Sequence, residues 1–334
     1  MTPPRAFRGF TCGLILMLFG LLPMLAAQTP GLEPVKRIKL SGPVGKRLDH
    51  MALDAKRDHL FVANSANNSL DIIELKQGKV LKSIPGQEGI QGVVYVPEHD
   101  RLFATLGSGV CHIYDADTFK LLKSQKVAGA DNPVHDAKSG LVYLTAADKK
   151  LAIIDAKTMN LKGEVNLPSA PTSFAIEKGR PRMYVNAHVP RQVHVLDTNK
   201  HEVLKRYQLE EAGNYAIALD EPNHRLFVGC RMEPRLVVLD TESGKQLASV
   251  PIPHDVDDLF YDAKRKQVYA SCGEGFLVVL KETQPNRFEV REKLATLKMA
   301  RNCLFDPDGS RLFLTVPGQS DKEGPEVRVY HVRP

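Results

Sequence analysis

Histidine and carboxylate side chains occur at two distant points of the chain in a pattern that could support metal binding or acid–base chemistry. Asp49 and His50 form one pair, and His254, Asp257 and Asp258 form a second group. Imidazole nitrogens and carboxylate oxygens bind divalent metals, and the same groups serve as general acids and bases. A divalent metal held by His50, His254 and Asp258 is therefore one hypothesis.

A plainer interpretation of these residues stays open, because their spacing matches no known metal motif. In that interpretation Asp49 and Asp257 satisfy backbone donors at the starts of strands, and the histidines are solvated. No cofactor follows from the sequence with certainty. Arg231 and Arg301 add a second hypothesis, an anionic ligand held through paired guanidinium donors.

Cysteines form a further candidate site. Cys230 and Cys272 each stand three residues after an aromatic residue, at corresponding positions of the chain. In an oxidising compartment such a pair suggests a disulfide. However, packed sheets lie about 10 Å apart, and a disulfide needs Cα atoms within about 7 Å. Cys303 is an alternative partner for Cys272, and Cys111 is expected to be an isolated buried thiol.

The elements that must position these residues follow from a sevenfold repeat. A short apolar–aromatic core recurs with its aromatic residues 42, 40, 41, 43, 42 and 44 positions apart. These aromatic residues are Phe61, Phe103, Tyr143, Tyr184, Phe227, Tyr269 and Phe313. Repeats of 40-odd residues are typical of propeller blades.

Each copy of the repeat predicts four short strands. An apolar strand precedes the aromatic core, and a third strand, often closed by aspartate, follows it, as at Asp115, Asp155, Asp197 and Asp240. A polar turn of the kind found in tight hairpins then leads to a fourth strand. The chain is therefore predicted to be an all-β, seven-bladed β-propeller.

The two ends of the repeat region complement each other. The last copy reaches a third strand at residues 327–330 and lacks a fourth. Residues 35–40 stand alone before the first copy, so we expect this N-terminal strand to pair with the last blade and close the ring. An open solenoid is the alternative, disfavoured because solenoids need atypical capping repeats.

Alignment of the seven copies gathers the candidate residues on one face. The starts of the innermost strands and the ends of the second strands open there, and loops on a rigid scaffold commonly carry function. The predicted ligand-binding face comprises Asp49, His50, His188, Arg231, His254, Asp257, Asp258, Arg301 and Asn302.

The first 27 residues have the layout of a cleaved secretory signal peptide. Arg5 and Arg8 precede an apolar stretch, and the small residues Ala26 and Ala27 precede Gln28. The apolar stretch is shorter than the roughly 20 residues of a membrane span, and no later stretch could cross a bilayer. We expect a single propeller domain over residues 28–334, monomeric, in the periplasm or secreted.

Charge and composition exclude several classes of function. Loss of Arg5 and Arg8 lowers the net charge from +6 to +4, and the remaining charges are interleaved without a basic stripe. Nucleic acid is therefore not expected as a partner. Tryptophan is absent, which removes the Trp-Asp signature of WD repeats, and no phosphate loop, Gly-x-Ser-x-Gly elbow or haem-attachment motif occurs.

The repeat resembles that of the YVTN-type β-propellers, within the WD40-like superfamily. The aromatic core, the strand closing in aspartate and a following Lys-x-Leu carry this resemblance over essentially all of residues 28–334. Residues 226–231, 257–262 and 271–275 look like those of exported bacterial members. The resemblance implies a propeller outside the cytoplasm and no single activity, because its members include surface proteins, binding scaffolds and enzyme-associated subunits.

Three functions follow as hypotheses. The first is a binding scaffold that presents a polar funnel to a protein or small ligand. The second is a lactonase-like hydrolase that uses a funnel metal or a His/Asp pair to activate water. The third is an accessory subunit of a redox or metal-handling system, suggested by the cysteines and histidines alone.

Overall fold

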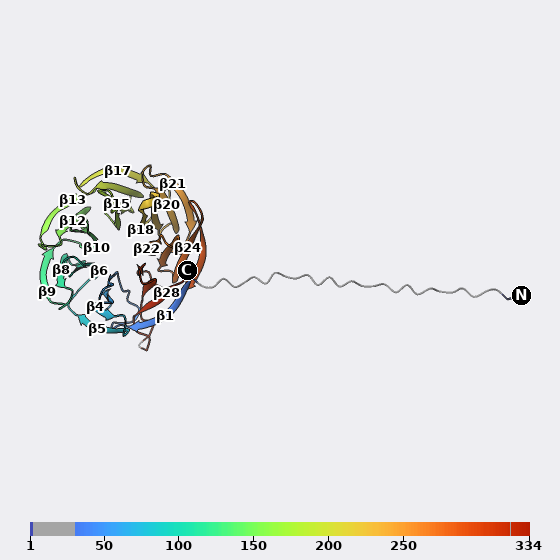
Figure 1. Cartoon of the computed structure of the whole chain (residues 1–334), viewed down its shortest axis with the longest axis horizontal. Helices are drawn as coiled ribbons and strands as arrows, with labels where there is room; N and C mark the ends of the chain where they lie inside the picture. The colour runs from blue at the N-terminus through green and yellow to red at the C-terminus, as the bar shows by residue number, and fades with distance from the viewer. Residues whose placement is uncertain (3–30, 321) are drawn as a thin grey trace.

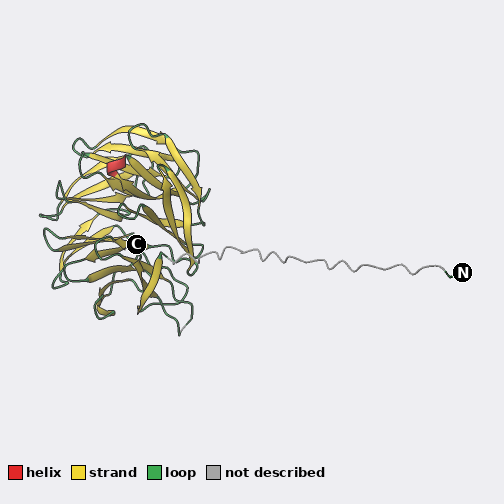
Figure 2. Ribbon diagram, turned by 45° about the vertical axis from the view of Figure 1, so that its right-hand side comes forward, coloured by secondary structure: helices red, strands yellow, loops and turns green. Residues whose placement is uncertain are grey.

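Seven antiparallel sheets are arranged around a central axis in the computed structural model (Figure 1). The structure describes residues 1–2, 31–320 and 322–334, so the predicted signal peptide and its cleavage site lie outside the described residues. Apart from the short 3₁₀ turn η1 (Glu221–Asn223), the regular elements of the described part are all strands (Figure 2). No helix in these ranges is long and apolar enough to cross a bilayer. The prediction of a seven-bladed propeller is confirmed.

The first two strands of each blade are the ones nearest the central axis. The inner strands are β2 (Met51–Asp54), β6 (Ile90–Val96), β10 (Asp131–Asp136), β14 (Phe174–Ile176), β18 (Asn214–Asp220), β22 (Val256–Asp262) and β26 (Cys303–Asp306). The second strands are β3 (His59–Asn64), β7 (Arg101–Leu106), β11 (Leu141–Ala146), β15 (Arg182–Ala187), β19 (Arg225–Cys230), β23 (Gln267–Cys272) and β27 (Arg311–Val316).

Two further strands complete each blade towards the outside. The third strands are β4 (Ser69–Glu74), β8 (Val110–Asp115), β12 (Lys150–Asp155), β16 (Gln192–Asp197), β20 (Arg235–Asp240), β24 (Phe276–Gln284) and β28 (Glu326–Val332). The outer strands are β5 (Lys79–Ile84), β9 (Leu121–Lys126), β13 (Leu161–Asn166), β17 (Glu202–Gln208), β21 (Gln246–Pro251), β25 (Arg287–Ala295) and β1 (Leu32–Lys39). We number the blades 1 to 7 in the order of their inner strands.

The outer strand of blade 7 comes from the other end of the chain, as predicted. β1 pairs antiparallel with β28, in a register that runs from Leu32 opposite Val332 to Lys39 opposite Glu326. In Figure 1 the blue β1 lies beside the red β28. The strand begins three residues before the predicted segment. This pairing closes the ring and rules out the open solenoid.

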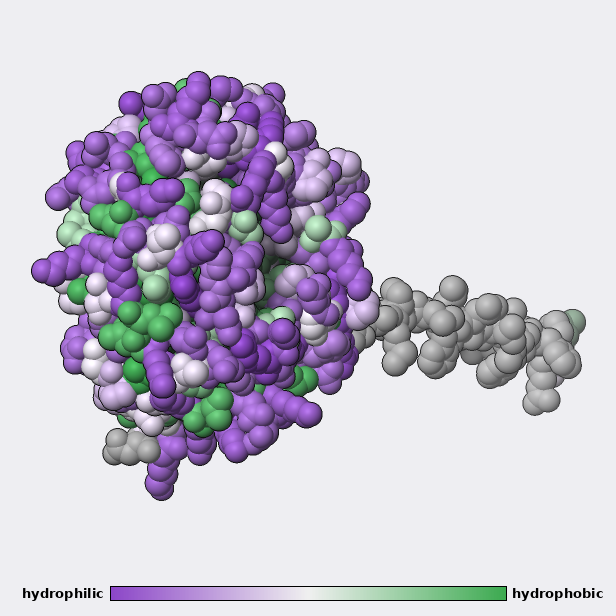
Figure 3. Space-filling model, turned by 60° about the vertical axis from the view of Figure 1, so that its left-hand side comes forward, coloured by the Kyte–Doolittle hydropathy of each residue, from purple (hydrophilic) through white to green (hydrophobic). Residues whose placement is uncertain are grey.

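The core is divided into seven layers, one between each pair of neighbouring blades. Both faces of each sheet are covered by the adjacent sheets, so the second and third strands are apolar on both sides. The seven repeat aromatics are at most 1% exposed. The surface seen in Figure 3 is mainly hydrophilic, with hydrophobic residues in small separate patches.

The aspartates that close third strands stabilise the turn to the outer strand. The Asp155 Oδ1 atom accepts hydrogen bonds from the backbone N–H groups of Lys157 (3.0 Å) and Thr158 (2.7 Å). Met159 then adopts a left-handed conformation with φ of 61°, and its N–H returns to the Asp155 carbonyl. The same turn occurs after Asp115, Asp197 and Asp240. It is an Asx-type turn, which explains the aspartate at this position of the repeat.

Candidate functional site

A cavity of about 540 Å³ opens where the inner strands begin and the second strands end, which we call the upper face. Its volume lies within the range of small-molecule sites. Seven of the nine candidate residues line this upper cavity: Asp49, His50, His188, Arg231, Asp257, Asp258 and Arg301. Repeat alignment therefore brought residues from five blades to one surface correctly.

The other two candidates lie outside the cavity lining. Asn302 is fully buried behind it, where its Nδ2 group donates to the Asp257 carboxylate over 3.2 Å. His254 is exposed in the loop before β22, and its backbone N–H donates to Glu274 Oε2 over 2.8 Å. The grouping of His254 with the cavity residues is therefore wrong, because the loop turns its side chain out to solvent.

His50 is held between two carboxylates. Its Nδ1 atom lies 2.8 Å from Asp49 Oδ1 and its Nε2 atom 3.4 Å from Asp258 Oδ1. Burial opposes a charge on this ring, but Asp258 and Asp49 outweigh that effect and raise the pKa of His50 well above its usual range. The Arg47 Nη1 atom forms an ion pair with the other carboxylate oxygen, Asp49 Oδ2, at 2.6 Å. His50 is therefore a structural imidazolium that links blade 1 to blade 6.

The predicted metal set is not assembled by the structure. His254 lies away from His50 and Asp258, and both ring nitrogens of His50 face carboxylates, so neither offers a free lone pair. Among the described residues, no three histidine, cysteine, aspartate or glutamate side chains are grouped as a metal ion would require. The metal hypothesis for His50, His254 and Asp258 is therefore wrong in its geometry.

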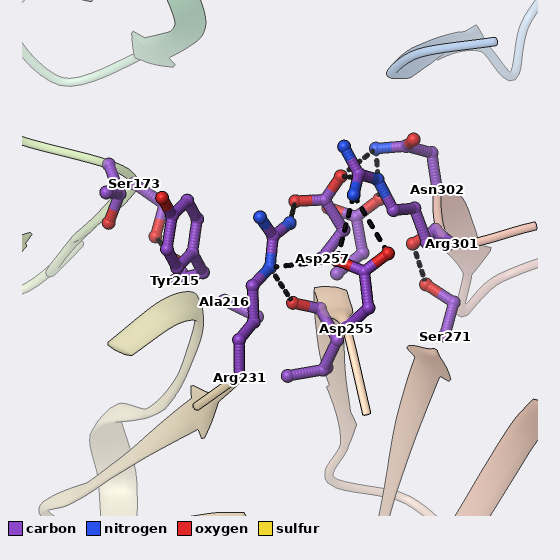
Figure 4. A network of polar contacts seen from close by, with 12 residues as sticks. Ser173, Tyr215, Ala216, Arg231, Asp255, Asp257, Ser271, Arg301 and Asn302 are labelled. Atoms are coloured by element: carbon purple, nitrogen blue, oxygen red, sulfur yellow. Dashed lines mark hydrogen bonds and ion pairs between the residues drawn. The ribbon is translucent and has the colours of Figure 1, made fainter. Parts of the chain in front are cut away.

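Two arginines and two aspartates form a compact network beside the cavity (Figure 4). Arg301 contacts Asp255 through Nη1 at 2.8 Å and Asp257 through Nε at 3.0 Å. Arg231 pairs with Asp257 through Nη2 and lies 3.5 Å from Asp255 through Nε. The Arg231 guanidinium also stacks 3.8 Å from the centre of the Tyr215 ring. The arginines predicted to hold an anion thus already face two carboxylates of their own chain.

The alternative interpretation was that aspartates satisfy backbone donors at the starts of strands. One aspartate does so, but it is Asp258, which that interpretation did not include. Asp258 Oδ2 accepts the backbone N–H of Cys303 in the next blade over 2.9 Å. Asp49 and Asp257 pair with side chains instead, as described above. The interpretation was thus wrong for Asp49 and Asp257, because arginine side chains occupy their carboxylates and the backbone N–H groups of Asp49 and His50 bond to the Ala63 and Gln91 carbonyls.

The opposite wall of the cavity, from blades 3 and 4, has few ionisable groups. It carries Asp131, Thr172, Ser173 and His188. The Thr172 hydroxyl donates to the Asn214 carbonyl over 3.1 Å. Burial and the nearby Arg231 charge lower the pKa of His188, so its imidazole is neutral.

Among the described residues that line this wall, Asp131 is the only formally charged one. Its Oδ1 atom accepts the N–H of its neighbour Asn132 over 2.7 Å. No cationic side chain of the described ranges lies within ion-pair distance of it. Burial raises the pKa of Asp131 to about 6; the His50 charge lowers it, and those of Asp49 and Asp257 raise it further.

Several residues of the site were missing from the predicted set of nine. Asp131, Thr172, Ser173 and Tyr215 stand at or next to inner-strand starts, so the same repeat alignment contained the signal for them. Arg47 lies in the loop before β2 and has no counterpart in the repeat, so nothing in the pattern indicated it.

The candidate disulfide between Cys230 and Cys272, which the spacing of packed sheets disfavoured, is not formed in the structure. Both are free and buried, as are Cys111 and Cys303. Cys230 packs in the layer between blades 4 and 5, and Cys272 in the layer between blades 5 and 6. A sheet therefore separates the two thiols, as the spacing of packed sheets suggested. Burial raises the pKa of Cys230 to about 12.

Comparisons with known proteins support the fold. No protein-family model matches the chain. The uncharacterized protein YncE of Salmonella typhi and that of Salmonella typhimurium are each 24% identical over 197 residues, which is 57% of this chain and 55% of theirs. The chain thus spans about half the length of these curated relatives. At this identity and coverage the relationship to them is weak.

Solved structures resemble the whole propeller. A chain of the mitotic checkpoint complex has a TM-score of 0.78 at 13% identity and matches over 97% of this chain and 99% of its own. The WD40 repeats of RRP9 give 0.77 at 12% identity, over 90% of this chain and 99% of theirs. Such low identity shows the fold alone, a β-propeller, and a fold by itself does not specify a function.

Proposed function

We propose that this chain is a non-catalytic binding scaffold outside the cytoplasm, and that its upper cavity takes up a small polar ligand. The observation that carries the proposal is the cavity itself. Its volume of about 540 Å³ suits a small molecule, and its polar groups are held on strand ends of a closed ring. Polar groups already fixed before binding lose little freedom when a ligand arrives, which favours affinity.

The geometry gives the hydrolase hypothesis less support. A general base must accept a proton, and His50 is a protonated ring with a carboxylate on each side. The Ser173 hydroxyl, which also lines the cavity, donates to the Tyr215 carbonyl and has no imidazole base beside it among the described residues. His50 and Ser173 are thus engaged in holding the site together, and the His50/Asp49 pair is not free to activate water.

The redox hypothesis rests on the cysteines, which are buried. A thiol exchanges electrons as its thiolate. Burial raises the pKa of Cys230 to about 12, and it raises the pKa of Cys111, Cys272 and Cys303 as well. Buried thiols that stay protonated support a role of these cysteines in packing more than a role in redox chemistry.

Export is supported by the leader-like residues 1–27 and by the resemblance to YVTN-type propellers. Expression of the full chain in a bacterial host, followed by cell fractionation and N-terminal sequencing, tests this part. We expect protein outside the cytoplasm that begins at Gln28. Uncleaved protein in the cytoplasm would contradict it.

Ligand uptake is tested by releasing bound small molecules. The purified protein is incubated with a small-molecule cell extract, separated from it, denatured, and the released compounds are identified by mass spectrometry. Arg231→Met and His188→Ala alter the upper cavity on different walls, so a folding defect in one leaves the other as a test. His224→Asn is the control, because His224 is exposed at the opposite face and asparagine tolerates its left-handed φ of 53°.

We expect a compound that the wild type and His224→Asn retain equally and that both cavity variants retain at least about tenfold less, a loss of about 1.4 kcal/mol. Equal retention by all four proteins, or no retained compound, would overturn the proposed uptake.

A further inference from the structure

Charge is distributed unequally over the walls of the upper cavity. In blades 1, 5, 6 and 7, each charged group has a partner of opposite sign: Arg47 with Asp49, His50 with Asp49 and Asp258, and Arg231 and Arg301 with Asp257. In blades 3 and 4, Asp131 faces the cavity and has no such partner among residues 31–320 and 322–334. The cavity is thus complete on one side and lacks a cation on the other.

The charge balance of the described lining points the same way. Four carboxylates face four cationic groups, and the Asp255 carboxylate behind Arg231 and Arg301 adds a fifth negative charge. His50 is the cation whose charge acts on Asp131 and lowers its pKa, but His50 is already paired with Asp49 and Asp258. The site therefore carries one negative charge in excess, on the wall where Asp131 lies.

We propose that the upper cavity binds a small organic amine whose ammonium group pairs with Asp131. This inference rests on the proposed function and names the chemical class of its ligand. A partly buried carboxylate without a cation is unfavourable, and an ammonium group removes that cost through charge-assisted hydrogen bonds.

The neighbours of Asp131 fit an ammonium group in particular. An ammonium carries three N–H donors and needs acceptors around it. The Asp131 Oδ2 atom, which accepts no hydrogen bond within the described chain, supplies one. The Thr172 and Ser173 hydroxyl groups line the same cavity, and their hydrogens point to backbone carbonyls. Their oxygens can therefore accept others, although Ser173 Oγ already accepts one hydrogen bond, from Asn186 Nδ2. Pro133 and Val134 line the cavity, are only partly buried, and offer apolar surface for the carbon part of the amine. A metal ion would need three such side chains, and an anion would face the excess negative charge.

Matched ligand pairs test the amine class. The probes are putrescine, glucosamine and tyramine. Putrescine is compared with its N,N′-diacetyl derivative and the other two with their N-acetyl derivatives, so that every positive charge is removed and the carbon skeleton of the amine is kept. Binding is measured by isothermal titration calorimetry to wild type, Asp131→Asn and Asp148→Asn. Asparagine at position 131 keeps the acceptor for the Asn132 N–H. Asp148 is an exposed aspartate of the same blade, and its left-handed φ of 59° tolerates asparagine.

We expect at least one amine to bind the wild type at least about tenfold more tightly than its acetyl derivative. Asp131→Asn should weaken that amine at least tenfold, and Asp148→Asn should leave it unchanged. Equal binding of amine and acetyl derivative, unchanged binding by Asp131→Asn, or no amine with a Kd below about 10 mM would overturn the proposal. Circular dichroism and thermal unfolding of each variant establish that it is folded.

Failure of the amine proposal can be told apart from failure of the proposed function. If the compounds released from the protein are neutral or anionic, and the Arg231→Met variant loses them, the cavity is a binding site and the amine class is wrong. If neither the extract nor the probes yield a ligand of the upper cavity, both proposals are wrong.

Discussion

At the upper cavity, the fold disfavours the ionised form of Asp131. Burial raises its pKa to about 6, with His50 acting against that shift and Asp49 and Asp257 adding to it. An unfolded aspartate has a pKa near 3.9. The folded protein therefore binds more protons than the unfolded chain between about pH 4 and pH 6. The resulting stability is present below pH 4 and is lost as the pH rises through 6.

The substitution Asp131→Asn removes this penalty. We expect it to raise the free energy of unfolding at pH 7.5 by on the order of 1 kcal/mol, allowing for solvent screening, and to change it little at pH 4. Urea unfolding of wild type and variant at both pH values measures this. A variant that is less stable than wild type at pH 7.5 would show that Asp131 already has a stabilising cation.

The buried cysteines give a second prediction at the residue scale. All four thiols of residues 28–334 are free and enclosed in layers between blades. We expect a thiol reagent to react with none of these thiols in the native protein. After unfolding without a reductant, it should react with four thiols. Two thiols in the unfolded, unreduced protein would mean that a disulfide exists after all.

At the scale of elements, the turn between third and outer strands is the most regular unit of the chain. The Asp155 carboxylate replaces two backbone hydrogen-bond partners that the turn lacks. Asp155→Ala should therefore lower the free energy of unfolding by about 1 kcal/mol, by analogy with the loss of a helix cap. Asp155→Asn keeps the Oδ1 acceptor and should cost less. Equal destabilisation by both changes would show that charge, not the hydrogen bonds, stabilises the turn.

Lysines of outer strands connect each of several blades to the next. Lys36 Nζ donates to the Leu75 carbonyl over 3.0 Å, and Lys205 Nζ to the Glu242 carbonyl over 3.1 Å. Lys123 Nζ reaches the Asn160 side chain in the same way. In each case an outer strand contacts the turn of the following blade. The lysines in the repeat therefore have a structural role between blades.

The strands and turns were the most predictable elements, because the same residue types recur at the same positions of each repeat. The aromatic core and the turn aspartates located the strands of the repeats, because buried strands and Asx turns restrict residue types strongly. Blade 6 departs from this pattern: β24 and β25 are nine residues long and lack the aspartate turn. Pairings across the cavity, such as His50 with Asp258, were beyond prediction because they depend on side-chain directions that repeat spacing does not contain.

At the scale of the whole molecule, blade 7 joins the two ends of the chain and closes the ring. β1 buries Leu32 and Ile38 against blades 6 and 7 and blade 1, and Arg37 pairs with Glu326 at 2.9 Å. Arg311 of blade 7 reaches Asp58 of blade 1 at 2.6 Å, much as Arg57 of blade 1 reaches Asp100 of blade 2. The closing interface is thus built like the others, so the walls of the upper cavity are held in place all round.

Two substitutions on the same strand test the closure. Ile38 is 1% exposed and Val35 is 54% exposed. Ile38→Ala should lower the free energy of unfolding by about 2–4 kcal/mol, as for other buried large-to-small changes, whereas Val35→Ala should change it by less than about 0.5 kcal/mol. If both substitutions were equally mild, β1 would not be docked in solution.

The most direct measurement is a crystal structure of the protein with the compound that it retains from the extract. Our account predicts electron density for the ligand inside the upper cavity, in contact with Asp131 on one wall and close to Arg231 or His50 on the other. Density at the opposite face or on the outer strands, with the upper cavity unchanged, would contradict it.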